Sequence, residues 1–356
     1  RSTQGYSSAA SDVYKRQYVK KLSVIVPCYN VGQYIDRCVE SLTSQTLDKS
    51  QYEIILVDDA STDDTWKHIE DWENRFPNII ITVHCDVNGK MGRARNIGLT
   101  YASGEYIGYA DSDDWTEPEM FEKMLEAAEN GKMDVVVCKS IRDHGNDYDK
   151  SKAGTGRIDV MNIDSEVKRK EFIVANPMSY AVWDKIIRHS LLSDNNISFP
   201  EGFAYEDIYY GTLLHLYAVK IAFVDSVFYH YFVNPKSTVL LKDVGYHKDI
   251  MSVNRMLFEE LNARGCFGLY HDELELDLLF TWYLGTVKVI CLRFQKPPYD
   301  MFCSLKQEVL ECMPDCFDNP YVATSMKEFY QLLVQLLKCN VTENELIQIA
   351  DNFKKM

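Results

Sequence analysis

Short apolar segments alternate with amphipathic helical patterns from residue 21 to residue 138. Strands are expected over 22–27, 53–57, 79–83, 106–108 and 134–138, and helices over 32–46, 91–102 and 117–130. The segment 53–57 is almost wholly apolar, as in a parallel strand buried on both faces. Alternation of this kind is typical of a parallel sheet with helices on both of its faces. The sequence therefore predicts an α/β fold.

The pattern changes in the second half of the chain. Residues 141–170 are polar and predict a surface excursion. A helix is then expected over 205–217 and strands over 220–224 and 227–233, and from about residue 245 the pattern is helical to the end. At 356 residues the chain exceeds one average domain, so we expect an α/β domain over 18–240 and a helical subdomain over 241–356. Residues 1–17 lack periodicity and do not begin with Met, and we interpret them as a disordered leader or a cloning remnant.

Charge, cysteine usage and hydropathy exclude several classes of protein. A formal net charge of −15 argues against a nucleic-acid partner, because no basic surplus is available to neutralise phosphates. The ten cysteines form no Cys-x-x-Cys pair, and Cys28, Cys85 and Cys138 lie in apolar runs that predict buried thiols in a reducing compartment. The apolar run 278–287 ends at Lys288 and is too short to span a bilayer, which predicts a buried helix instead.

Polar side chains gather where three of the expected strands end. The strands lead into Pro27-Cys28-Tyr29-Asn30, into Asp58-Asp59 and into Asp111-Ser112-Asp113-Asp114. Ligands of open α/β sheets bind outside the carboxyl ends of the strands. We therefore expect these three segments to meet in one crevice.

The acidic segment after the fourth strand predicts a metal site. Asp111, Asp113 and Asp114 place three carboxylates within four positions, where like charges repel and burial disfavours ionisation. A bound divalent cation relieves this conflict, and Asp-x-Asp is short enough to direct two oxygens toward one metal that carries a diphosphate. A solvated acidic turn is the alternative interpretation.

Five segments resemble, in order, the motifs of the family 2 glycosyltransferases, which are inverting enzymes with the GT-A fold. They are Ser23–Asn30, Glu53–Asp63, Asn88–Gly98, Gly104–Asp114 and Glu206-Asp207. The resemblance covers about residues 21–235 and points to the bacterial branch that builds capsule, exopolysaccharide, lipopolysaccharide or wall polymers. It implies a Rossmann-like mixed sheet flanked by helices, followed by the C-terminal helical subdomain.

The resemblance implies a nucleotide site. It would be formed by Pro27, Tyr29, Asn30, Asp58, Asp59, Lys90, Arg95, Asp111 and Ser112. Tyr29 would lie against the base or ribose, with core packing as the alternative. Asp58 would accept a hydrogen bond from the imide N–H of uracil, which favours uridine or thymidine over cytidine. Asp59 can also cap the next helix, and Arg95 can either offset diphosphate charge or form a structural ion pair.

The same resemblance implies a metal and a catalytic base. Asp113, with Asp111, would hold Mn²⁺ or Mg²⁺, which stabilises the charge on the departing nucleoside diphosphate. Asp207 would be the general base and Glu206 would orient the acceptor or its loop, although acidic residues are also favoured at the start of a helix.

Two residues are candidates for acceptor contacts. Trp183 can stack on the acceptor sugar and His230 can supply a polar contact, with core packing as the alternative for both. Many family members carry an arginine where this chain has Phe232. The diphosphate contact in this region therefore differs from the family pattern.

The function expected from these residues is transfer of a hexose from a nucleotide donor, favoured as a UDP-sugar, to a hydroxyl of a glycan or lipid-linked acceptor. A cytoplasmic enzyme with peripheral contact to the inner face of the membrane and a homo-oligomeric state are further expectations. The alternatives are a nucleotidyltransferase and a degenerate nucleotide-binding scaffold. The segment after the first strand lacks both a glycine-rich phosphate loop and a Gly-x-Gly-x-x-Gly fingerprint, which disfavours a nucleotidyltransferase and a dinucleotide-dependent oxidoreductase.

Overall fold

The structure is a computed structural model that describes residues 20–144, 153–234 and 237–355. The expected leader, residues 1–17, lies outside the described residues. The described residues divide into two compact units. The first unit comprises Arg1–Asn162, Ala181–Gly202 and Tyr217–Asn234, and the second comprises Ile163–Tyr180, Phe203–Leu216 and Pro235–Met356.

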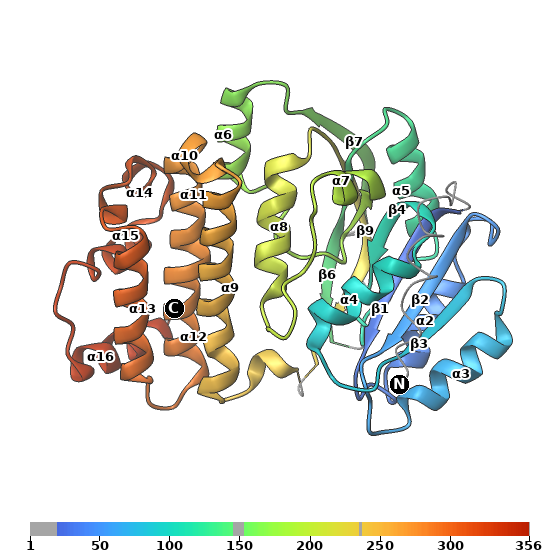
Figure 1. Ribbon diagram of the computed structural model, residues 1–356, viewed down its shortest axis with the longest axis horizontal. Helices are drawn as coiled ribbons and strands as arrows, with labels where there is room; N and C mark the ends of the chain where they lie inside the picture. Colours follow the sequence, from blue (N-terminus) through green and yellow to red (C-terminus); the bar gives the residue numbers. More distant parts are fainter. Residues whose placement is uncertain (1–19, 145–152, 235–236, 356) are drawn as a thin grey trace, which may run out of the picture. The chain divides into compact units, whose positions relative to one another are not determined.

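The first unit is built on a nine-stranded sheet whose first half is parallel (Figure 1). Its strands lie in the order β3 (Ile80–His84), β2 (Tyr52–Asp58), β1 (Lys20–Cys28) and β4 (Gly104–Tyr109), each parallel to its neighbour. These are the strands that the alternating pattern predicts. The parallel half of the sheet therefore confirms the predicted fold class.

The second half of this sheet is mixed. β8 (Lys185–Arg188) runs antiparallel to β4 and to β6 (Val135–Asp143). β9 (Lys220–Phe232) runs parallel to β6, and β5 (Trp115–Thr116) and β7 (Gly154–Asn162) pair antiparallel with β9. The two expected runs 220–224 and 227–233 thus form one strand, in which register shifts absorb the polar break.

The expected surface excursion over 141–170 contains regular elements. The described residues of this range include the end of β6, the whole of β7 and the start of α6 (Glu166–Ala175). Every residue of β7 is exposed, and polar and apolar residues alternate only over Arg157-Ile158-Asp159-Val160, which is a short signal for a strand. Strand pairing with β9, which composition does not reveal, defines it.

Helices cover both faces of the parallel strands. α2 (Ile35–Thr43), α3 (Thr65–Arg75) and α5 (Met120–Glu129) contribute to one hydrophobic core together with Leu22, Val24 and Val26 of β1. α4 (Lys90–Tyr101) packs on β1 and β2, with Gly98 directly against the side chains of Ile25 and Val57. Successive residues of β1 therefore face opposite helical layers, as strand geometry requires.

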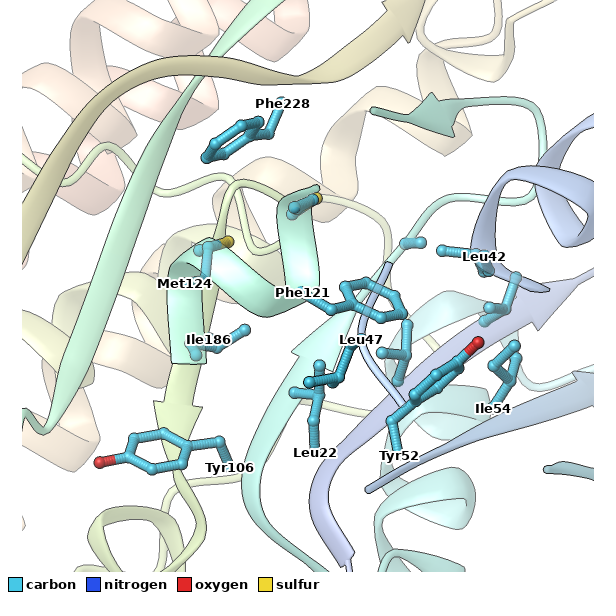
Figure 2. Packing of buried hydrophobic residues seen from close by; sticks show 14 of the residues in the cluster. Leu22, Leu42, Leu47, Tyr52, Ile54, Tyr106, Phe121, Met124, Ile186 and Phe228 are labelled. Atoms are coloured by element: carbon cyan, nitrogen blue, oxygen red, sulfur yellow. The ribbon is translucent and has the colours of Figure 1, made fainter. Parts of the chain in front are cut away.

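Figure 2 shows part of this core, with labelled side chains from β1, β2, β4, α2 and α5 among others. The rings of Tyr52 and Phe121 meet edge to face at 5.3 Å between centroids, and Leu22, Leu42 and Ile54 are fully buried around them. α7 (His189–Asp194) packs against β4 and β8. All ten cysteines are free, and Cys28, Cys85 and Cys138 are buried as expected.

The second unit is helical in the described residues. Its elements are α6, α8 (Glu206–Tyr217), η2 (Thr238–Leu240), α9 (Val244–Ala263), α10 (Cys266–Leu269), α11 (His271–Leu278), η3 (Leu279–Leu284), α12 (Gly285–Arg293), α13 (Tyr299–Cys312), η4 (Cys316–Asp318), α14 (Pro320–Ser325), α15 (Glu328–Gln335) and α16 (Glu343–Phe353). α9, α12 and α13 pack on one another, in orange in Figure 1.

The apolar run 278–287 is a buried helical segment of this unit, as predicted. Leu279 and Trp282 within it are fully buried. Among the described residues, no helix has both the length and the apolar character that crossing a membrane would require. α8, which the sequence assigns to the α/β part, packs with the C-terminal helices in this unit.

Candidate active site

The three polar strand ends lie at one edge of the sheet in the first unit. Cys28 pairs in register with Asp58, and Asp58 pairs with His84 at the end of β3. β4 also ends at this edge, where the Ala110 N–H donates to the carbonyl of Ile25 at 3.1 Å. The register of the parallel strands therefore brings together the segments that the sequence singles out.

Asp58 is fully buried at this edge and engaged on both carboxylate oxygens. Oδ1 accepts from the Ser61 N–H at 3.3 Å, and Oδ2 lies 2.8 Å from Nδ1 of His84. The His84 ring is half exposed and lies 4.9 Å from the ring of Trp66, between centroids. Tyr29, at the end of β1, is also half exposed. Tyr29 and His84 are thus both exposed at this end of the sheet, and the buried Asp58 contacts the His84 ring.

Asp59 and Asn30 order the loops around this edge. Asp59 is buried and accepts from the Gly89 N–H at 2.9 and 3.0 Å, at the start of α4, and burial raises the pKa of its carboxyl. Asn30, at φ 52°, accepts from the Thr62 N–H at 2.8 Å and donates its own N–H to Ser61 Oγ at 3.0 Å. Asp59 therefore fixes the start of α4 rather than capping α3, the next helix in the chain, as the sequence suggests. Asn30 ties the loop after β1 to the loop after β2.

Lys90, Pro27 and Ser112 are positioned by the same framework. Lys90 begins α4 in a left-handed conformation at φ 63°, which the hydrogen bonds of Asp59 support. Pro27 lies within β1 opposite Val57, and Ser112 is buried in the acidic loop. These residues shape the backbone of the strand-end edge.

Arg95 and Asp111 form a close ion pair. Nη2 of Arg95 donates to Oδ1 of Asp111 at 2.8 Å, and the arginine side chain is buried. The guanidinium also lies 5.3 Å from the ring centroid of Phe199. Of the two roles open to Arg95, the structure shows the ion pair with a carboxylate, and this pair holds Asp111 at the end of β4.

Asp113 and Asp114 occupy different environments. Asp113 accepts from Asn234 Nδ2 at 3.0 Å, and burial, followed by the nearby Asp111 charge, raises the pKa of its carboxyl. Asp114 is buried and accepts from the Tyr229 hydroxyl at 2.8 Å and the Phe232 N–H at 2.7 Å. Burial and then the charges of Asp111 and Asp113 raise its pKa to about 9. The crowding of carboxylates expected from the sequence is therefore present.

Tyr229 and Arg37 stabilise the acidic loop, and neither is among the residues predicted for the site. The Tyr229 hydroxyl also accepts from the Asp111 N–H at 2.9 Å, so it links Asp111 to Asp114. Arg37 donates to the carbonyl of Asp113 at 2.7 Å, with its guanidinium 3.7 Å above the Trp115 ring and 4.7 Å from the Phe232 ring. A cation from α2 thus lies over Phe232, the position where family members carry arginine.

The structure surrounds Trp183 and His230 with packing contacts. Trp183 is partly buried and stacks on Tyr229 with centroids 4.5 Å apart. His230 is buried, with Nδ1 3.1 Å from Asp143 and Nε2 2.9 Å from Glu117. Both ring nitrogens of His230 are therefore occupied by carboxylates of the first unit.

Glu206 and Asp207 lie in the first turn of α8, in the second unit. The turn that precedes them is held by α9: Tyr205, at φ 64°, places its hydroxyl 2.6 Å from Nδ1 of His247, and the Ala204 N–H donates to Asp249 at 2.9 Å. Because Nε2 of His247 contacts the Leu241 carbonyl at 2.7 Å, Nε2 carries the proton and Nδ1 accepts from Tyr205. The start of α8 is therefore fixed within this unit.

The body of α8 is attached to the same unit by a buried carboxylate. Asp277 of α11 accepts from the hydroxyls of Tyr180 and Thr212, the latter at 3.0 Å, and burial raises its pKa to about 6. Gly211 allows the backbone of Tyr180 to approach, since a Cβ there would lie 2.9 Å from its Cα. These contacts set the orientation of the helix that begins with Glu206 and Asp207.

No preformed cluster of three or more His, Cys, Asp or Glu side chains suited to a metal occurs in residues 20–144, 153–234 and 237–355. Asp111 and Asp113 nevertheless fit a magnesium or manganese ion. Such ions are commonly held by one or two carboxylates together with the phosphates of the substrate. The raised pKa of Asp113 shows that its charge is poorly compensated by the protein alone.

The strand order and the acidic segment after β4 define the chain as a GT-A fold, and comparison with solved structures agrees. The Staphylococcus aureus TarS fragment 1–349, solved in complex with UDP-GlcNAc, superposes with a TM-score of 0.67 at 21% identity. The match covers 94% of this chain and 92% of the TarS fragment. At this identity the likeness concerns the fold.

Sequence comparison gives the family. The model of glycosyl transferase family 2 matches residues 23–189. EpsH of Bacillus subtilis (strain 168), which is named as a glycosyltransferase, is 30% identical over 250 residues that cover 67% of this chain and 67% of EpsH. The chain belongs to glycosyl transferase family 2.

A further relative has a more specific name. The poly(ribitol-phosphate) β-N-acetylglucosaminyltransferase TarS of Staphylococcus aureus (strain Mu50) is 28% identical over 261 residues. These residues cover 73% of this chain but only 44% of full-length TarS. This chain therefore corresponds to less than half of that protein.

Proposed function

We propose that this glycosyltransferase transfers a hexose-type sugar, with inversion, from a UDP-sugar to a hydroxyl of a glycan or lipid-linked acceptor during synthesis of a cell-surface polysaccharide. One observation carries the proposal. Asp58 ends β2, and Asp111 and Asp113 follow β4, so they lie at the carboxyl ends of the two strands that flank β1, where ligands of open α/β sheets bind. The names of EpsH and TarS and the UDP-GlcNAc bound to TarS support the same class of reaction.

The residues of the first unit would bind the donor. Tyr29 offers an exposed ring for the base or ribose, and Lys90 contributes a positive charge at the start of α4. Asp113 and Asp111 would hold Mn²⁺ or Mg²⁺, which, when bound, supplies Lewis-acid stabilisation of the departing diphosphate. The Arg95 ion pair and the Tyr229 hydroxyl fix Asp111 for this task.

We assign the proton transfer to the second unit. Asp207 would take the proton of the acceptor hydroxyl as that oxygen attacks the anomeric carbon, and Glu206 would orient the acceptor or its loop. The contacts from His247 and Asp249 give the start of α8 the rigidity that a positioned base needs. Trp183 and His230 remain candidates for the acceptor side, although the packing described above favours structural roles.

The remaining parts of the proposal concern the setting of the enzyme. We propose an α/β catalytic domain over 18–240, a helical subdomain over 241–356, and a cytoplasmic enzyme that contacts the inner face of the membrane. A homo-oligomer is part of the same proposal. Co-sedimentation with anionic vesicles and light scattering of the purified chain would test the last two points.

The test of the reaction is release of UDP from a panel of UDP-sugars, with GDP-, CDP- and dTDP-sugars beside them, in the presence of Mn²⁺ or Mg²⁺. We expect turnover with a UDP-sugar, its loss in Asp113→Asn, and retained donor binding without transfer in Asp207→Asn. Nucleotide binding by the wild-type chain without turnover on any donor, with and without candidate acceptors, would support the scaffold alternative instead.

A further inference from the structure

We propose that His84, rather than Asp58, reads the nucleobase of the donor, and that Asp58 acts by fixing the proton position of the His84 ring. This inference rests on the proposed function and deepens it, because it names the residue that selects the base. No motif of the sequence points to His84. Its importance follows from three contacts at the ends of β2 and β3.

The first observation is that Asp58 is closed to a ligand. Its side chain has no exposed surface, and its two oxygens contact the Ser61 N–H and Nδ1 of His84. A base could reach this carboxylate only if the loop after β2 and the His84 ring both moved. The direct contact between Asp58 and uracil that the sequence suggests is therefore not available in this arrangement.

The second observation is that the His84 ring is hydrogen-bonded to buried Asp58 on one side and is half exposed. Its side chain is 46% exposed, while Nδ1 lies 2.8 Å from the buried carboxylate. A carboxylate accepts hydrogen bonds, so Nδ1 carries a proton, and in the neutral ring Nε2 is then an acceptor. The structure records no partner for Nε2 among the described residues. His84 thus carries one acceptor atom, on a half-exposed side chain, at the strand-end edge of the sheet.

The third observation is that the ring is held in place. Trp66, in the first turn of α3, packs against it with centroids 4.9 Å apart and an interplanar angle of 56°. Two contacts, one polar and one aromatic, therefore define both the position and the rotation of the imidazole. An acceptor fixed in this way can discriminate between bases, because a mismatched donor or acceptor would remain unpaired.

The acceptor atom Nε2 of His84 favours a base that offers an imide N–H. Uracil and thymine present N3–H as a donor at the edge that distinguishes them, whereas cytosine presents N3 as an acceptor. Nε2 of a neutral His84 accepts from the former and repels the latter. The proposed preference for uridine or thymidine over cytidine therefore depends on the tautomer that Asp58 imposes.

The test compares the affinities of UDP and CDP for the full chain by calorimetry at pH 8.0 with Mg²⁺. His84→Asn is the principal variant, because the asparagine amide can occupy the place of Nδ1 and keep a donor on Asp58 while Nε2 is removed. We expect the UDP affinity to fall about tenfold, the worth of one hydrogen bond, and the CDP affinity to rise, because the atom that repels N3 of cytosine is removed. Asp58→Asn, which turns an amide N–H toward Nδ1 and moves the ring proton to Nε2, should weaken UDP and strengthen CDP.

His68→Asn is the matched control. His68 also lies in the first unit with Nδ1 3.0 Å from a carboxylate, that of Asp36, but it belongs to the α3 surface rather than to a strand end. This variant should bind both nucleotides as the wild type does. An unchanged ratio of UDP to CDP affinity in His84→Asn, or an equal loss for both nucleotides, would overturn the inference while the proposed function stands. A folded wild-type chain that binds neither nucleotide would overturn the proposed function itself.

Discussion

Removal of one hydroxyl, in Tyr229→Phe, tests how the acidic loop is supported. The Tyr229 hydroxyl donates to Asp114 at 2.8 Å and accepts from the Asp111 N–H at 2.9 Å, and both Tyr229 and Asp114 are buried. The substitution changes no packing atom of the ring. It removes two hydrogen bonds and leaves a buried carboxyl and a backbone N–H each short of one partner.

The size of the effect follows from these two bonds. Each is worth about 1 kcal/mol net, and a buried group left without its partner costs about 1–3 kcal/mol. We therefore expect Tyr229→Phe to lower the free energy of unfolding by about 2–4 kcal/mol. It should also weaken metal-dependent UDP binding, because the Asp111 backbone loses a contact that fixes it.

Tyr52→Phe provides a control of the same chemistry. The Tyr52 ring is fully buried in the same unit, but its hydroxyl has no hydrogen-bond partner among the described residues. Because no bond is lost and a buried polar atom is removed, this variant should be neutral or slightly more stable.

Urea unfolding followed by tryptophan fluorescence measures both variants. Four of the five tryptophans lie in the first unit, and Trp183 stacks directly on Tyr229. Equal stability of Tyr229→Phe and Tyr52→Phe would refute the reasoning, since it would mean that the two bonds of Tyr229 contribute nothing.

Three other predictions test separate parts of the account. Asp113→Asn should abolish the dependence of UDP affinity on Mn²⁺ in calorimetry, and a metal response equal to that of the wild type would show that the ion is held elsewhere. Because burial raises the pKa of Asp277 to about 6, above its ordinary value of 3.8, the folded state holds the extra proton, and the contribution of Asp277 to the free energy of unfolding should fall by roughly 3 kcal/mol as pH rises from about 4 to about 6. Asp277→Asn should flatten this part of the curve of unfolding free energy against pH, and an unchanged slope would contradict the assignment. Thiol labelling of the native protein should modify the exposed Cys303 and Cys339 rapidly and spare Cys28 and Cys138, where burial raises the thiol pKa, and rapid labelling of the latter pair would contradict the described core.

The sequence predicts the parallel half of the sheet well because its strands carry their own signal. β1 and β2 are apolar on both faces, end in polar residues and are separated by amphipathic helices, so pattern alone defines their order in the chain. The position of Asp58, Asp111 and Asp113 at strand ends follows from the same pattern. β7 carries a weaker signal, because all of its residues are exposed and only Arg157 to Val160 alternate in polarity.

The contacts of the site were less predictable, because they join residues far apart in the chain. Nothing in the segment around Arg37 indicates that its guanidinium would lie over Phe232, since this depends on how α2 packs beside β5 and β9. Likewise, the sequence leaves open whether Arg95 forms an ion pair with a carboxylate or is available to bind a phosphate. The distance from Arg95 to Asp111 in the folded protein shows the ion pair. The sequence does not single out His84, because a histidine that ends a strand has no distinctive neighbours in sequence.

The roles of Tyr229 and Asp277 illustrate the same limit. Tyr229 lies in an aromatic segment whose pattern predicts only a packed strand. Its hydroxyl nevertheless bridges two residues of the acidic loop. Asp277 lies in a helix whose neighbours are apolar, and only the fold shows that its carboxylate binds Tyr180 and Thr212. Residue type and spacing identify candidates, whereas partners require the packed structure.

The central claim is that the strand-end edge of the first unit binds a nucleoside diphosphate together with a divalent cation. Titration of UDP into the purified wild-type chain, with and without Mn²⁺, tests it most directly. We predict binding that requires the metal. Absence of UDP binding under both conditions, with a sample shown to be folded, would contradict the claim.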